Sequence, residues 1–218
     1  MICIAHLSDL HFCARHLTWV SKAMDHAIDH AIEHGAQCAV ISGDALDAAI
    51  NLHEPAVSAL FARVRRLANR MPVLILQGTP SHDRPGSLAP LRALGPRVLV
   101  VERICQAALV NGEAWQVSEG HAFDAAPEGD TLFSCLPSVN KAAVAAVAGV
   151  DRAAEQAGDA VLALCQAWAA LNEHARAAGV PTVLVSHGTV NGCVTETARA
   201  MVSPDHEFTT GALFAAEA

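Results

Sequence analysis

The sequence lacks the segments that mark membrane-spanning and secreted proteins. Across its 218 residues, no apolar run is long and charge-free enough to span a bilayer. The N-terminus has no basic stretch followed by an apolar one, so no signal peptide is expected. We therefore expect a cytoplasmic protein that has no membrane partner.

Paired cysteines and a surplus of positive charge are also missing. None of the seven cysteines forms a Cys-x-x-Cys pair, and their odd number favours buried, reduced thiols in the cytosol. The formal net charge is −8, which argues against a broadly basic surface for nucleic acid. A nuclease that holds DNA through a local patch or a partner stays compatible with this charge.

The first half of the chain alternates apolar runs with helical patterns. Strands are predicted at residues 2–7, 38–41 and 73–76. Between them, one helix ends at Gly35, and another begins at Pro55 and stops at Pro72. This alternation predicts parallel strands joined by right-handed crossovers.

The pattern changes after Pro96, where short strands follow closely at residues 98–101, 106–110, 114–117 and 131–135. Asn111-Gly112 indicates a tight hairpin, so a second, more antiparallel sheet is expected. An alanine-rich helical region from about 141 to 178, broken at Gly149 and Gly158, precedes a last strand at 182–185. The chain shows no internal repeat and no linker.

Aspartate and histidine follow four of the predicted strands. The segments are Asp9-Leu10-His11, Gly43-Asp44-Ala45-Leu46-Asp47, Gly78-Thr79-Pro80-Ser81-His82-Asp83 and Ser186-His187-Gly188. Open α/β sheets place their ligand sites at the carboxyl ends of strands. Converging carboxylates and imidazoles suit a pair of divalent metal ions.

The spacing gives these residues different expected tasks. Asp9 and His11 lie two apart on a segment expected to be extended, so both can point to one side and bind one metal ion. Asp44 is placed to bridge two ions, and His187 to serve the second. Two cations about 3.5–4 Å apart lower the pKa of a bridging water and clamp phosphoryl oxygens.

In this order, the four segments resemble those of the calcineurin-like metallophosphoesterase superfamily. The strings HLSDLHF, ISGDALD, VLILQGTPSHD and LVSHGTVNG are similar to the nuclease subunit of SbcCD-type DNA repair exonucleases, especially phage-type versions. The resemblance covers nearly the whole chain. It implies one metallophosphoesterase domain over residues 1–218, an αββα sandwich of two mixed β-sheets flanked by helices.

The resemblance also implies a function. We expect a DNA exonuclease or endonuclease subunit that hydrolyses phosphodiesters with two divalent ions, Mn²⁺ first, with Fe, Zn or Mg as alternatives. The expected partners are DNA and an SbcC-like ATPase subunit, and a homodimer is also compatible. In the family, the residue matching His82 stabilises the transition state or protonates the leaving oxygen. Asp83 would orient the His82 imidazole, and Asp47 would support a metal ligand from behind.

The sequence departs from the family pattern at two places. The usual Gly-Asn-His-Asp is replaced by Gly-Thr-Pro-Ser-His-Asp, so Ser81 stands where a metal-binding Asn is expected. Ser81 either binds the metal, directly or through water, or only shapes the loop. A downstream Gly-His-x-His is absent before Ala218. We therefore expect a domain that lacks its C-terminal part, binds metal weakly and is nearly inactive as it stands.

Two other functions remain open on the sequence alone. One is a phosphoesterase that acts on a nucleotide or another small phosphomonoester. The other is a truncated, inactive domain that binds a partner or has no activity.

Overall fold

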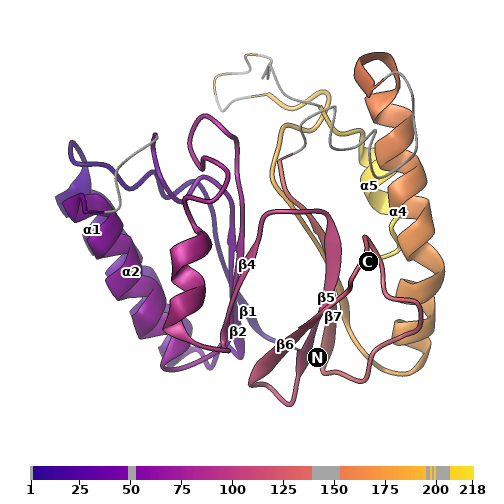
Figure 1. Ribbon diagram of the computed structural model, residues 1–218, viewed down its shortest axis with the longest axis horizontal. Coiled ribbons are helices and arrows are strands. Elements are labelled where there is room, and N and C mark those ends of the chain that lie inside the picture. Colours follow the sequence, from indigo (N-terminus) through magenta and orange to yellow (C-terminus); the bar gives the residue numbers. More distant parts are fainter. Residues whose placement is uncertain (1, 49–52, 139–152, 195–196, 198, 200–206) are drawn as a thin grey trace.

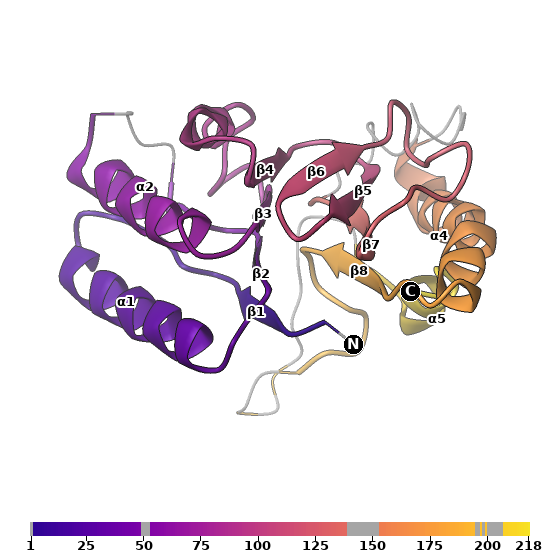
Figure 2. The same ribbon diagram turned by 90° about the horizontal axis from the view of Figure 1, so that it is seen from below.

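Two four-stranded sheets lie face to face, and helices cover the outer face of each (Figure 1). The computed structural model describes residues 2–48, 53–138, 153–194, 197, 199 and 207–218. Seen from below, the same four layers follow one another from α1 and α2, through the sheets, to α4 and α5 (Figure 2). The chain is therefore α/β, with two sheets flanked by helices.

The first sheet has the order β1-β2-β3-β4, and all its strands are parallel. Two α-helices and a 3-10 helix, η1, form the connections. The elements are β1 (Ile4–Leu7), α1 (Leu17–Glu33), β2 (Cys38–Ser42), α2 (Pro55–Ala68), β3 (Val73–Leu76), η1 (Ala89–Leu94) and β4 (Val98–Val101).

The second sheet has the order β6-β5-β7-β8 and is mixed. Strand β5 pairs antiparallel with β6 and β7, whereas β7 pairs parallel with β8. The elements are β5 (Cys105–Val110), β6 (Ala114–Val117), β7 (Thr131–Leu136), α4 (Ala153–Ala177), β8 (Thr182–Ser186) and α5 (Thr210–Phe214).

The structure corrects the expected sheets in one respect. Residues 98–101 were expected in the second, antiparallel sheet, but β4 pairs in parallel with β3, from Val73↔Val98 to Leu76↔Val101. The 3-10 helix η1 carries the chain back along the sheet, so this connection is another crossover. Only the second sheet is mixed, and the expectation of two mixed sheets is wrong for the first.

The core consists of three apolar layers. In the outer layer of the first sheet, Met24 and Ile28 of α1 and Leu60 and Val64 of α2 are buried against β2 and β3. The middle layer joins the inner faces of the two sheets. Its fully buried members include Leu74, Leu76, Ala107, Phe133 and Cys135.

The third apolar layer lies under α4, where Val161, Leu164 and Trp168 are buried as the helical spacing predicts. Gly158 was expected to break this helix, but it lies inside α4. One glycine costs a helix only about 1 kcal/mol, and packing against the sheet outweighs that cost. The other expected break, Gly149, lies outside the described residues, as do residues 141–152.

The expected hairpin is present between β5 and β6. Asn111 and Gly112 adopt φ angles of 54° and 62°, the left-handed conformation that tight hairpins require. Among the helices of the described residues, none is both long and apolar enough to cross a membrane.

Candidate metal centre

The loops that follow β1 and β2 continue side by side beyond the strands. Asp9 N–H donates to the Gly43 carbonyl at 3.1 Å, and His11 N–H donates to the Asp44 carbonyl at 3.0 Å. As a result, single donor atoms of Asp9, His11 and Asp44 all lie within 4.8 Å of one another. The structure thus brings together three residues that the sequence assigned to one metal ion.

These three residues share an uncommon backbone conformation. Asp9, His11 and Asp44 have φ angles of 52°, 48° and 50°. The sequence suggests that the segment around Asp9 is extended, but these φ angles show that it is not. A non-glycine residue in this region costs of order 1–3 kcal/mol, and such residues cluster at functional sites. The surrounding hydrogen bonds hold all three in place, which is the pattern of a preorganised ligand set.

His187 reaches this edge from the second sheet, at the end of β8. Its Nδ1 lies 2.7 Å from the Ser42 carbonyl oxygen, and its Nε2 lies 3.3 Å from Asp44 Oδ1. A carbonyl oxygen only accepts, so Nδ1 carries the proton and donates it there. In a neutral imidazole, Nε2 is then an acceptor that faces a carboxylate oxygen. Two facing acceptors require a cation between them, which is a proton or a metal ion.

The electrostatics agree with this arrangement. Burial works to raise the pKa of Asp44, but hydrogen bonds from His187 and from Thr79 outweigh it and lower that pKa to about 2. Burial works to lower the pKa of His187, but the hydrogen bond to Asp44 and the charge of Asp44 outweigh it and raise that pKa. Asp44 is thus a stable anion, and it draws a cation to its side.

Two glycines make this close approach of the loops feasible. A Cβ on Gly43 would overlap the His187 ring, and a Cβ on Gly78 would overlap the backbone nitrogen and Oδ1 of Asp44. Gly43 also has a φ of 104°, which side chains disfavour. The glycines of both motifs are therefore needed where Asp44 and His187 meet.

Thr79, which the sequence analysis did not single out, contacts Asp44 directly. Its backbone N–H and its hydroxyl donate to Asp44 Oδ1 at 2.7 and 3.0 Å. Ser81 does not reach Asp44. It is exposed in a turn closed by His82 N–H and Asp83 N–H, which both donate to the Thr79 carbonyl. The Ser81 hydroxyl instead donates to Thr79 Oγ1 at 3.3 Å.

The sequence contains one indication that Thr79 would lie next to Asp44. Thr79 follows Gly78 directly, as the Asn follows the Gly in the family motif. Relative to His82, the matching position is instead Ser81, because Pro80 and Ser81 lengthen the turn. In the structure, the residue of this turn that donates to Asp44 is Thr79.

Asp83 has a different task from the expected one. It is fully buried, and its carboxylate accepts from Ala45 N–H at 3.2 Å, Leu46 N–H at 3.0 Å and Gly78 N–H at 3.0 Å. Burial raises the pKa of Asp83 in spite of these three donors. Both oxygens are thereby engaged by backbone, and His82 Nδ1 has no hydrogen-bond partner in the described part of the chain. Asp83 therefore ties the loops after β2 and β3 together and does not orient His82.

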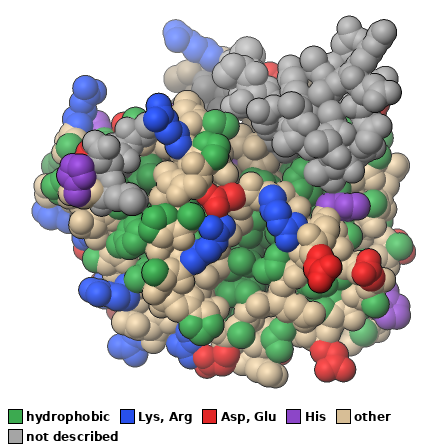
Figure 3. Space-filling model, viewed as in Figure 1, with side chains coloured by type: hydrophobic (Ala, Val, Ile, Leu, Met, Phe, Trp, Pro, Cys, Tyr) green, Lys and Arg blue, Asp and Glu red, His purple; other side chains and the backbone are tan. Residues whose placement is uncertain are grey.

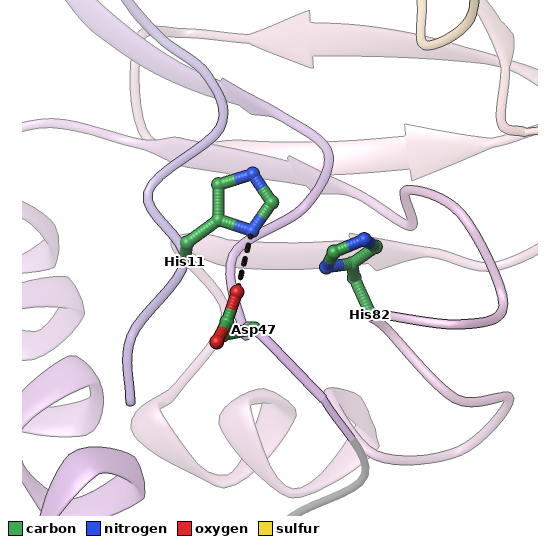
Figure 4. Close-up of side chains that lie close together, drawn as sticks. All are labelled: His11, Asp47 and His82. Carbon is green, nitrogen blue, oxygen red and sulfur yellow. Dashed lines mark ion pairs between the residues drawn. The ribbon is translucent and has the colours of Figure 1, made fainter. Parts of the chain in front are cut away.

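His82 and Asp47 lie close to the His11 ring (Figure 4). Asp47 Oδ1 is 3.3 Å from His11 Nδ1, whereas Asp9 Oδ1 is 4.0 Å from His11 Nε2. The His11 and His82 rings meet edge to face, with centroids 4.7 Å apart. Asp47 thus lies beside Nδ1 of His11, whereas Asp9 lies on the Nε2 side of the ring.

No protein-family model and no curated protein sequence matches this chain. Among solved structures, it is similar to the Pseudomonas putida nuclease MPE, with 23% identity and a TM-score of 0.35. The match covers 46% of this chain and 48% of that one, so the chain matches about half the length of that protein. At this level of similarity, the assignment of a function depends on the side chains of this chain itself.

The revised task of Asp83 is testable by Asp83→Asn. The amide replaces one acceptor oxygen by a donor, so at least one buried backbone N–H loses its partner. Each such loss costs about 1–3 kcal/mol, and we expect the free energy of unfolding in urea to fall by at least that amount. Asp124→Asn, at an exposed position, is the matched control and should leave it unchanged. Equal stability of the two variants would contradict the tie between the loops.

Proposed function

We propose that this chain is a metal-dependent phosphodiesterase of the metallophosphoesterase type. The observation that carries the proposal is the contact between Asp44 and His187, a buried carboxylate oxygen and an imidazole nitrogen 3.3 Å apart at the carboxyl ends of two strands. The left-handed conformations of Asp9, His11 and Asp44 support it, because such strain is held where a ligand set is preorganised.

The donor set fits two divalent ions. Asp9, His11 and Asp44 would hold one ion, and Asp44 and His187 would hold the other, with the Thr79 hydroxyl beside them. Mixed carboxylate and imidazole donors suit Mn²⁺, and Fe, Zn and Mg are alternatives. When bound, such a pair activates a water molecule and neutralises the charge on the phosphoryl oxygens.

The residues of the chain would prepare this site and assist the bond cleavage. The Thr79 N–H fixes Asp44 Oδ1, and the Ser42 carbonyl fixes the tautomer of His187. His82 lies next to His11 without a partner for Nδ1 among the described residues, so its imidazole is free to transfer a proton. We assign to it the donation of a proton to the leaving oxygen.

The proposed substrate is DNA, and the proposed partner is the ATPase subunit of an SbcCD-type complex. The support comes from the motif strings in the sequence. On the face in Figure 3, the Lys and Arg side chains of the described residues lie singly and do not form one continuous patch. Two of the arginines on α2 are paired with acids of α1, Arg63 with Asp25 and Arg66 with Asp29. A DNA substrate would therefore be held with the help of the partner subunit.

The second candidate function is the hydrolysis of a small phosphate ester. Substrates of different length distinguish it from DNA cleavage. We would compare the cleavage of double-stranded DNA, of a short oligonucleotide and of a chromogenic phosphomonoester, with Mn²⁺ present. Faster turnover of the monoester than of either DNA would favour the small-molecule phosphoesterase.

Asp44→Asn tests the metal site. The amide removes the charge that both ions would share, so Mn²⁺-dependent hydrolysis should fall by about 10²–10³-fold or more, as for loss of a main electrostatic group. The circular dichroism spectrum should stay close to that of wild type, since Asn can still accept from Thr79. Asp124→Asn serves as the control. Activity of Asp44→Asn within a few-fold of wild type would refute the proposed role of Asp44.

His82→Ala separates metal binding from bond cleavage. We expect the affinity for Mn²⁺, measured by calorimetry, to be unchanged, whereas kcat falls by about 10²–10⁴-fold, the usual contribution of an acid or base. His26→Ala, on the exposed face of α1, is the control and should change neither quantity. A loss of Mn²⁺ affinity in His82→Ala would mean that His82 is a ligand of this ion.

A further inference from the structure

His11, Asp47 and His82 come from three different loops and converge on one small volume (Figure 4). They follow β1, β2 and β3, respectively. Single donor atoms of the three side chains all lie within 4.8 Å of one another. This group shares only His11 with the Asp9, His11 and Asp44 group, and it lies on the Nδ1 side of the His11 ring.

The nitrogens that face this volume make no hydrogen bond with the described residues. Nδ1 of His11 and Nδ1 of His82 are both buried, and neither makes a hydrogen bond within the described residues. Asp47 Oδ1 is 3.3 Å from His11 Nδ1 but outside hydrogen-bond geometry. A buried polar atom without a partner costs about 1–3 kcal/mol, unless something absent from the protein itself, such as a metal ion, satisfies it.

The donor set and its spacing match a particular class of ion. Two imidazoles and one carboxylate are the ligands of Zn²⁺ and similar borderline ions, whereas two carboxylates and one imidazole form a harder set. Donors around a tetrahedral Zn²⁺, each about 2.0–2.1 Å from it, stand roughly 3.3 Å apart. The separation of His11 Nδ1 and Asp47 Oδ1 already has this value.

We propose that His11, Asp47 and His82 form a second metal site, which takes borderline transition-metal ions such as Zn²⁺ or Co²⁺ and competes with the Asp9 and Asp44 site for the His11 ring. A neutral imidazole has one free lone pair, so His11 binds an ion through Nε2 or through Nδ1, but not through both. An ion on the Nδ1 side therefore withdraws His11 from Asp9 and Asp44.

The consequence of this competition rests on the proposed function, although the site itself does not. An ion held by His82 Nδ1 also removes that imidazole from proton transfer. A borderline ion would thus inhibit the Mn²⁺-dependent hydrolysis in two ways, by taking a ligand and by taking the proton donor. Hydrolysis would therefore proceed with Mn²⁺ and would be inhibited when a borderline ion such as Zn²⁺ is present.

The test is a titration of the metal-free full chain with Co²⁺ alone. The intensity of the visible absorption bands reports a tetrahedral site, and X-ray absorption at the cobalt edge counts the imidazole ligands. We expect one tetrahedral Co²⁺ with two imidazoles in wild type. Asp47→Asn and His82→Gln should each weaken Co²⁺ binding by at least about 10–100-fold, because loss of even an outer partner of a metal site costs that much.

Two further variants complete the test. Asp44→Asn should keep the tetrahedral Co²⁺ spectrum while losing Mn²⁺ binding, and His26→Gln should change neither. Wild-type Co²⁺ affinity in both Asp47→Asn and His82→Gln would overturn the second site, as would loss of the Co²⁺ spectrum in Asp44→Asn. Failure of wild type to bind Mn²⁺ at all would overturn the proposed function alone and would leave the Co²⁺ result to decide on this site.

Discussion

The contact between Asp44 and His187 sets the conditions for the rest of the site. The Ser42 carbonyl accepts from Nδ1 of His187, so Nε2 faces a carboxylate oxygen of Asp44 at 3.3 Å. Both side chains are about nine-tenths buried, so water does little to screen the charge of the Asp44 carboxylate. Only a proton or a metal ion between them makes this contact favourable. It also connects the two sheets, since Asp44 follows β2 and His187 follows β8.

The neighbouring loops are built to hold this contact. There is no room for a Cβ at Gly43 or at Gly78. The Asp83 carboxylate accepts from backbone N–H groups of the loops that follow β2 and β3. Asp9 and His11 accept left-handed backbone conformations so that their side chains reach the same volume as Asp44. Strain of this kind, supported by buried hydrogen bonds, is what a preorganised ligand set requires.

Most of the fold could be predicted from the sequence, because strong local signals mark its elements. Apolar runs in the sequence predict each strand of the described residues within two residues of its observed ends. The sheet to which β4 belongs could not be predicted in this way, since a short apolar run does not show which strand it pairs with. Gly158 was expected to break the helix, but it lies inside α4, because packing of α4 on the sheet outweighs the low helix propensity of glycine.

The sequence motifs point to residues that lie together in the structure but do not show their contacts, and the role of these residues as metal ligands stays a prediction. The motifs located Asp9, His11, Asp44 and His187, which the structure places at one edge of the two sheets. The tasks of Thr79, Ser81 and Asp83 depend on the path of one turn, and its hydrogen bonds to the Thr79 carbonyl are not visible in the order of residues. The second group around His82 likewise depends on which nitrogen of His11 faces Asp47.

Anomalous X-ray diffraction at the manganese edge, from crystals grown with Mn²⁺, tests the central claim most directly. The account predicts an anomalous peak between Asp44 and His187, at ligand distance from Asp44 Oδ1 and His187 Nε2. If those two atoms remain in direct contact while no Mn²⁺ lies near Asp44, the cation between them is a proton, and the claim that this edge is a metal centre is wrong.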